Sequence, residues 1–253
     1  MITERRGFQQ RMSEIKQSLK GMNPSEIDIV LSQAKIELFK PKPFEELTGI
    51  ALFERQVSRM IDRGYPKMMA LSETGFRDIL DPLREIIGDY QGGDTPFLIV
   101  IPPNIASISD QLSLIEYEGS GVTQFLKDED LINREGILTP SEPYIVTKVE
   151  AGDQLLGVSA DSAFEGLADN GRFPLTISEG AALLIQYPHV LDFMNTSFAG
   201  TTHRSGHAID MYVYAGAVKL KRDPGYYADP RWGVPSCERR ISSQAAKYHH
   251  GQQ

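Results

Sequence analysis

Two histidines stand four residues apart in the segment AGTTHRSGHAID, and a carboxylate follows them. They are His203 and His207, followed by Asp210, and imidazole and carboxylate groups are ligands that zinc accepts. The glycine at position 206 and the β-branched and aromatic residues downstream favour a hairpin over a helix, with residues 204–206 as a three-residue loop. The two imidazoles would then be cross-strand neighbours that could share a metal ion.

A metal site at this hairpin needs at least one more protein ligand. Strand alternation puts Asp210 on the face opposite to His207, so the further ligand would have to be Cys237, His189 or Asp192. A pair of solvent-facing turn histidines explains the same spacing without any ligand role. We therefore prefer turn histidines and keep the metal site as the alternative. The chain has no H-E-x-x-H, G-x-S-x-G or C-x-x-C motif and no phosphate-binding glycine loop, and we expect no cofactor.

The strands after the histidines predict a β-meander with one polar face. A turn at residues 215–216 would place Asp210 opposite Lys221 and Tyr212 opposite Lys219, with these four side chains exposed to solvent. An exposed Asp–Lys pair needs no catalytic explanation. Aromatic rings beside cations suit an anionic or planar ligand.

The segment RDPGYYADPRWGVP then carries prolines and large aromatic residues. It either folds back over the tyrosines or forms a partial lid above a pocket between Trp232 and the sheet, with Arg231 or Arg239 supplying positive charge. The predicted ligand-binding residues are Tyr212, Tyr214, Lys219, Arg231 and Trp232.

Cys237 is the only thiol in the chain. As a nucleophile it would need cations such as Arg239 or Arg240 nearby to lower its pKa. Free cysteine more often packs as a small hydrophobic residue, so we expect a buried structural role. A single cysteine excludes an intrachain disulfide, and the charged N-terminal segment does not resemble a signal peptide, so we expect a cytoplasmic protein.

The charge distribution limits the partners. The formal net charge is −8, and residues 46–198 hold 10 Lys and Arg against 24 Asp and Glu, a balance of −14. An acidic body excludes general nucleic-acid binding, which depends on basic side chains. The longest apolar runs are too short to cross a membrane, and we expect no membrane partner.

Apolar spacing indicates a helical hairpin over residues 1–45, with a turn at KGMNP. It either docks on the main domain or serves as a homo-oligomerisation arm. Residues 46–245 mix helices with strands such as PFLIVI and YIVTKV, without a βαβ rhythm. We therefore expect an α+β fold, in which a helical N-terminal part is followed by a mixed domain ending in an antiparallel β-meander and by a disordered tail at 246–253.

Several segments together resemble a bacterial family known only as a domain of unknown function. They include FERQVSRMIDRGYPKMMALSETGFRDILDPLRE, PYIVTKVEAGDQLLGVSADSAFEGL, GRFPLTISEGAALLIQYPHVL and WGVPSCERR. The resemblance covers roughly residues 50–240 and implies one domain there, without implying an activity. It also implies that the position of His203 need not be histidine.

These observations favour a non-catalytic cytoplasmic protein that binds a small anionic ligand or a protein partner. The alternative is an enzyme that uses a His203/His207 metal site or Cys237 as a nucleophile.

Overall fold

The computed structural model describes residues 46–88, 90–123 and 126–244, and residues 17, 19–24, 26, 27, 29–31 and 34. The predicted hairpin at residues 1–45 lies largely outside this part of the chain, and the predicted tail at 246–253 lies wholly outside it. The described residues around Asn23 form a reciprocal cap. The Asn23 side chain accepts from the Glu26 N–H at 3.0 Å, and the Glu26 carboxylate accepts from the Asn23 N–H at 2.9 Å.

Serine and threonine side chains cap the first turns of four helices, at Ser72 of α5, Ser107 of α6, Ser159 of α7 and Thr176 of α8. Helix α3 ends at Arg63, and the following Gly64 has a left-handed φ of 97°. The helices are α3 (Gly49–Arg63), α4 (Tyr65–Met68), α5 (Glu73–Leu80), α6 (Ile108–Ser113), α7 (Ala160–Asp169) and α8 (Ile177–Gln186), with 3-10 turns η1 (Asp81–Ile86), η2 (Asp128–Asp130), η3 (Asp153–Leu155) and η4 (Pro188–Asp192).

The strands concentrate in the second half of the chain. They are β1 (Thr95–Val100), β2 (Glu116–Tyr117), β3 (Ser120–Thr123), β4 (Leu131–Asn133), β5 (Tyr144–Val149), β6 (Phe173–Pro174), β7 (Asn195–His203), β8 (His207–Tyr214), β9 (Ala217–Pro224), β10 (Trp232–Gly233), β11 (Ser236–Cys237) and β12 (Arg239–Ser242). One sheet has the order β1-β5-β12 and is antiparallel. A larger sheet has the order β10-β7-β8-β9-β3-β2, with β4 also on β7. Because β7, β8 and β9 are consecutive antiparallel neighbours, the predicted α+β fold with a C-terminal meander is confirmed.

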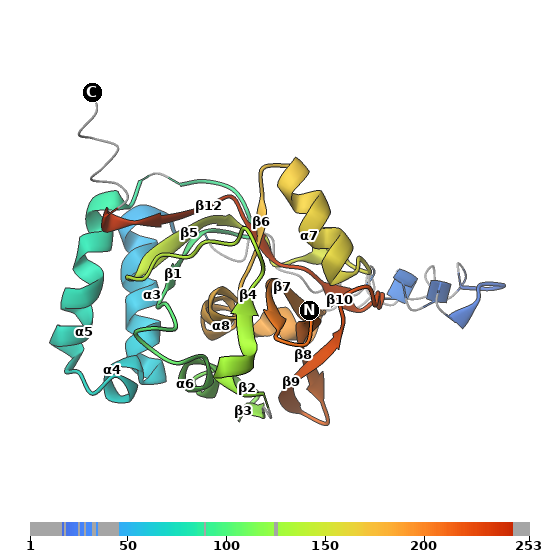
Figure 1. The fold of residues 1–253 in the computed structure, drawn as a ribbon, viewed down its shortest axis with the longest axis horizontal. Coiled ribbons are helices and arrows are strands. Elements are labelled where there is room, and N and C mark those ends of the chain that lie inside the picture. Colours follow the sequence, from blue (N-terminus) through green and yellow to red (C-terminus); the bar gives the residue numbers. More distant parts are fainter. Residues whose placement is uncertain are drawn as a thin grey trace, which may run out of the picture.

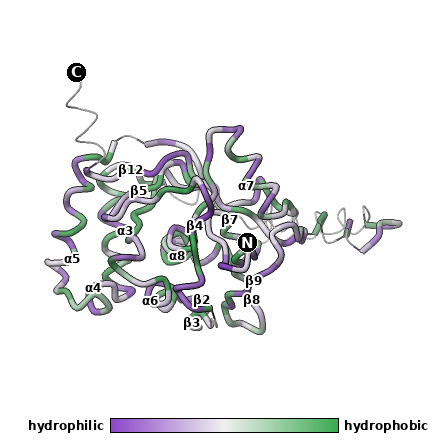
Figure 2. The backbone as a smooth tube through the Cα atoms, viewed as in Figure 1, coloured by the Kyte–Doolittle hydropathy of each residue, from purple (hydrophilic) through white to green (hydrophobic). Residues whose placement is uncertain are grey.

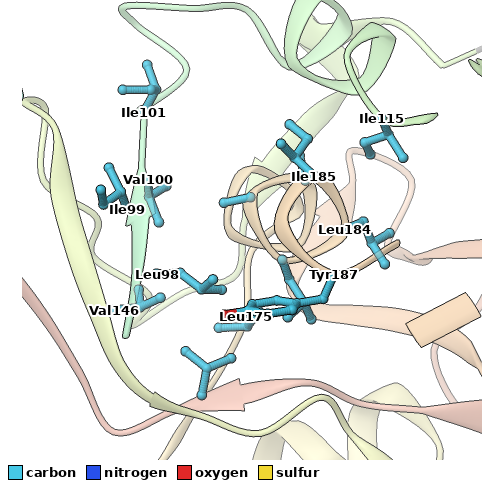
Figure 3. Packing of buried hydrophobic residues seen from close by; sticks show 14 of the residues in the cluster. Leu98, Ile99, Val100, Ile101, Ile115, Val146, Leu175, Leu184, Ile185 and Tyr187 are labelled. Atoms are coloured by element: carbon cyan, nitrogen blue, oxygen red, sulfur yellow. The ribbon is translucent and has the colours of Figure 1, made fainter. Parts of the chain in front are cut away.

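Helix α8 lies at the centre of the molecule, between the two sheets (Figure 1). It is buried along its whole length, and Figure 2 colours it mostly hydrophobic. Leu184 and Ile185 of α8 lie among apolar side chains from β1 and the segments around it (Figure 3). Burial on all sides explains why the sequence of α8 is apolar around its circumference.

Helix α3 covers the outer edge of β1. The side-chain amide of Gln56 donates to the carbonyl of Phe97 at 2.8 Å and accepts from the N–H of Ile99 at 2.9 Å. Gln56 is fully buried, and its amide therefore takes the hydrogen-bonding place that a neighbouring strand would occupy.

Helix α7 packs on β7 at the other end of the molecule (Figure 1). Ala160 and Ala163 of α7 form a separate apolar cluster with Ala199 and Ala208 of the sheet. Because these side chains are small, the helix can lie close to the strands. The sheet face that carries Asp210 is thus partly covered. No helix among the described residues combines the length and hydrophobicity needed to span a membrane.

Candidate functional site

Strands β7 and β8 form the predicted hairpin, with its loop at residues 204–206. Gly206 has a φ of 83°, the left-handed conformation expected of a three-residue loop. The Ser205 hydroxyl lies 2.6 Å from Nδ1 of His203 and 2.8 Å from Nδ1 of His207. The Ser205 N–H also donates to Nδ1 of His203. The hairpin therefore gathers both imidazoles around a serine hydroxyl that sequence reasoning overlooked.

His203 is buried and His207 is half-buried, which corrects the expectation of solvent-facing histidines. The surroundings of His203 nevertheless do not resemble a metal centre. Nη1 of Arg222 lies 3.1 Å from Nε2 of His203, and Oδ2 of Asp130 lies 3.8 Å from the same nitrogen. A guanidinium beside the ring disfavours a second cation there. Within the described part of the chain, no three His, Cys, Asp or Glu side chains form a group that could hold a metal ion. None of the further ligands considered from the sequence joins the two histidines.

The β8–β9 register is the one predicted from the sequence. Asp210 pairs with Lys221 and Tyr212 pairs with Lys219. The cation over Tyr212 is nevertheless Lys221, whose Nζ lies 5.3 Å from the ring centroid, while Lys219 lies 4.8 Å from the centroid of Tyr214. Tyr214 is 62% exposed, so the tip of the meander presents an aromatic ring to solvent, while Lys219 is half-buried.

The loop after β9 folds back onto the polar face. Trp232 is only 7% exposed. Its ring lies 6.0 Å from that of Tyr212, and Nζ of Lys221 lies 4.7 Å above it. Arg231 donates to Asp229 from Nε and Nη2 at 2.9 and 2.6 Å. The predicted residues Tyr212 and Trp232 are therefore together around Lys221, whereas Arg231 is engaged by Asp229.

Asp210 is not solvent-exposed, which corrects the expectation of an exposed Asp–Lys pair. It is 5% exposed, and Lys221 forms its ion pair with Asp223 instead. Burial raises the pKa of Asp210 to about 7, against a hydrogen bond from Ser197 that lowers it, and the Asp223 charge raises it further. The sequence missed this burial because α7 and the loop after β9 cover the face from distant parts of the chain.

Cys237 is buried, as expected from its packing tendency. Burial raises the pKa of its thiol to about 12, and the charge of Glu179 acts in the same direction. Arg240 lowers this pKa, but its guanidinium is already bound to Glu179. Arg239 belongs to β12 of the other sheet and contacts Glu238, so it supplies no charge to the meander site.

An open cleft of about 340 Å³ lies where β4 and the residues after it face α7. It is lined by Ile132, Asn133, Arg134, Glu135, Asp161, Phe164, Thr202 and Gly206. Sequence analysis missed this site. Arg134 and Asp161 belong to segments that only the fold brings together, and neither stands in a recognisable motif.

Arg134 is the central side chain of the cleft. Its Nη2 donates to Oδ1 of Asp161 at 2.6 Å, and its guanidinium carbon lies 5.2 Å from the Phe164 ring centroid. Its Nε is shielded from solvent and has no hydrogen-bond partner among the described residues. The backbone N–H of Asp161 donates to the carbonyl of Gly225, and a Cβ at Gly225 would overlap the Asp161 carboxylate. Asp161 is thus held in place by the loop after β9.

Comparison with known proteins places most of the chain in a family. The model of the Family of unknown function (DUF5701) matches residues 59–218, more than half of the chain. The chain belongs to this family. No curated protein and no solved structure matches it.

The DUF5701 match bears out the resemblance noted from the sequence. The residues of the Arg134 cleft, both hairpin histidines, Tyr212 and Tyr214 lie inside the matched span. Lys219, Arg231, Trp232 and Cys237 lie beyond its end. Of the predicted meander site, only the two tyrosines of β8 therefore lie within the matched span.

Proposed function

We propose that this protein is a non-catalytic binding protein whose small ligand carries a carboxylate or phosphate group held by Arg134. The observation that supports this proposal is the place of Arg134 on the wall of a cleft, where its Nη2 is bound to Asp161 and its guanidinium lies beside the Phe164 ring. A carboxylate or phosphate oxygen of the ligand would accept a charge-assisted hydrogen bond from this guanidinium.

The chemistry of the other candidate groups supports a binding role over the enzyme alternative. The thiol of Cys237 is buried with a pKa of about 12, so little nucleophilic thiolate forms at neutral pH. The Ser205 hydroxyl is close to an imidazole, but the backbone N–H groups of Ser205 and Gly206 both donate to atoms of His203. They are therefore not available to stabilise an oxyanion.

A protein partner at the end of the meander is a second candidate function. Tyr214 is exposed there beside the half-buried Lys219, and Tyr226 in the following loop is 79% exposed. Exposed tyrosines are frequent anchors of protein–protein interfaces. In this version Tyr212, Trp232 and Arg231 form the support behind the contact surface.

Our placement in the bacterial cytoplasm rests on the single cysteine and on the family resemblance.

The small-ligand proposal is tested by NMR saturation-transfer titrations with acetate, 4-methylpentanoate, succinate and inorganic phosphate. We expect at least one of these anions to bind the protein and to bind Arg134→Gln at least tenfold more weakly. Arg77→Gln on α5, which removes an exposed arginine that pairs with Glu54, is the matched control and should bind like the wild type. Thermal unfolding of Arg134→Gln checks that the variant is folded. If neither these four anions nor an amino acid that carries the same carboxylate binds the wild type, the small-ligand proposal is wrong.

A further inference from the structure

The Arg134 cleft carries charges of both signs. Arg134 supplies one positive charge, and Asp161 and Glu135 supply two negative charges. Glu135 is exposed and forms no ion pair with any residue that the structure describes. An anion that occupied Arg134 alone would therefore lie near two carboxylates, which repel it.

Apolar side chains complete the cleft. Phe164 offers its ring beside Arg134, and Ile132 is solvent-exposed at the same opening. At Gly206 nothing lies within 4 Å of the point where a Cβ would stand, so the hairpin side of the cleft is open. The volume of about 340 Å³ is near the lower end of the roughly 300–1,000 Å³ of ligand pockets, which suits a molecule of amino-acid size.

We propose that the ligand is a free α-amino acid with an apolar side chain. Its carboxylate binds Arg134, its ammonium group faces Asp161 and Glu135, and its side chain packs against Phe164 and Ile132. This inference rests on the proposed function, because it uses Arg134 as the anchor of the ligand's anionic group. It adds the cationic group and the apolar group that the same ligand must carry.

The two carboxylates have different parts in this arrangement. Asp161 is fixed by Arg134 on one side and by the Gly225 loop on the other, so it presents a preformed acceptor to the ammonium group. Glu135 has no such support and is free to turn toward the ligand. The ammonium group offsets the negative charge that the ligand's carboxylate brings near Asp161 and Glu135, which a carboxylic acid without the amine does not do.

The test compares leucine with two molecules that each lack one of its charged groups and keep its branched side chain. L-Leucine carries both charged groups, 4-methylpentanoate lacks the amine, and 3-methylbutylamine lacks the carboxylate. Calorimetric or NMR titration should show leucine binding at least tenfold more tightly than either of the other two. Glu135→Gln should reduce the preference for leucine over 4-methylpentanoate by at least threefold, while Glu165→Gln, an exposed change on α7, should leave it unchanged.

The outcomes separate this inference from the proposed function. If 4-methylpentanoate binds as tightly as leucine and Arg134→Gln weakens both, Arg134 is an anion site and the amino-acid assignment is wrong. If 3-methylbutylamine binds best and Arg134→Gln has no effect, both proposals are wrong. If none of the three molecules binds, but succinate or phosphate does, the amino-acid inference alone is overturned.

Discussion

Arg240 and Glu179 form a buried ion pair with two parallel hydrogen bonds, from Nε to Oε1 at 2.6 Å and from Nη2 to Oε2 at 2.8 Å. The Tyr144 hydroxyl and the Thr176 N–H also donate to the same carboxylate. The pair connects the start of the central helix α8 to β12, near the C-terminal end of the described chain.

Removing one partner of this pair should be strongly destabilising. Glu179→Ala leaves the Arg240 guanidinium buried without its counter-charge, and we expect the free energy of unfolding to fall by about 3–5 kcal/mol. Urea denaturation measures the change. Glu165→Ala, on the exposed side of α7, should change stability by no more than about 0.5 kcal/mol. A loss of less than about 1 kcal/mol in Glu179→Ala would contradict the assigned role.

Asp210 should make stability depend on pH. Its folded pKa of about 7 is higher than that of an unfolded aspartate, about 3.9, so the folded state binds the proton more tightly. This contribution is complete below about pH 4, is lost progressively as the pH rises to about 7, and stays lost above it. Asp210→Asn should remove that slope in urea denaturation measured from pH 4.5 to 8.5, whereas the exposed Asp78→Asn should keep it. An unchanged slope in Asp210→Asn would disprove the assignment.

Two glycine-to-alanine substitutions in helices should have opposite effects. A Cβ at Gly180 of α8 would overlap the buried ring of Phe198, so Gly180→Ala should destabilise the protein by about 1–3 kcal/mol. A Cβ at Gly166 of α7 meets nothing within 4 Å, so Gly166→Ala should stabilise it by up to about 1 kcal/mol through helix propensity. Chemical denaturation of both variants checks the pair. Equal effects would contradict the packing described for α8.

Trp232 should report on the packing of the meander face, since it is the only tryptophan. Its buried position against Tyr212 and Lys221 predicts blue-shifted emission that acrylamide quenches poorly. Tyr212→Ala should shift the emission to the red and increase quenching, whereas Tyr226→Ala, an exposed change in the same loop, should do neither. Strong quenching of the wild type would show that the loop is open in solution.

Cys237 should be inert in the folded protein. Burial and the raised pKa of its thiol predict that a disulfide reagent at pH 8 reacts with it only at the rate of unfolding. The reaction should become fast and stoichiometric in 6 M guanidinium chloride. A fast reaction of Cys237 in the folded protein would instead support the alternative in which this thiol is a nucleophile.

The sequence predicts local features, such as strand register and helix caps, better than it predicts which side chains become buried by distant segments. Alternation and the turn at residues 215–216 determine the β8–β9 register, because a shift by one residue would expose Met211 and Val213. Thr176 and Glu179 form a capping box at the start of α8, and their spacing is likewise visible in the sequence.

The burial of Asp210 and the Arg134 cleft could not be inferred in this way. The sequence of β8 alternates as in a strand with one exposed face, and the segments that bury Asp210, α7 and the loop after β9, lie elsewhere in the chain. Arg134 and Asp161 meet only because β4 pairs with β7 and α7 packs on the same strand. Neither contact leaves a periodic or spacing signal in the sequence.

Gln56 has a consequence for the behaviour of the protein in concentrated solution. An uncovered β1 would offer its backbone N–H and C=O groups as a template on which the edge of a second molecule could grow, a common start of aggregation. The Gln56 amide occupies the carbonyl of Phe97 and the N–H of Ile99, so this edge cannot recruit a foreign strand without first displacing α3. One helical side chain thereby protects the most apolar strand of the chain from self-association.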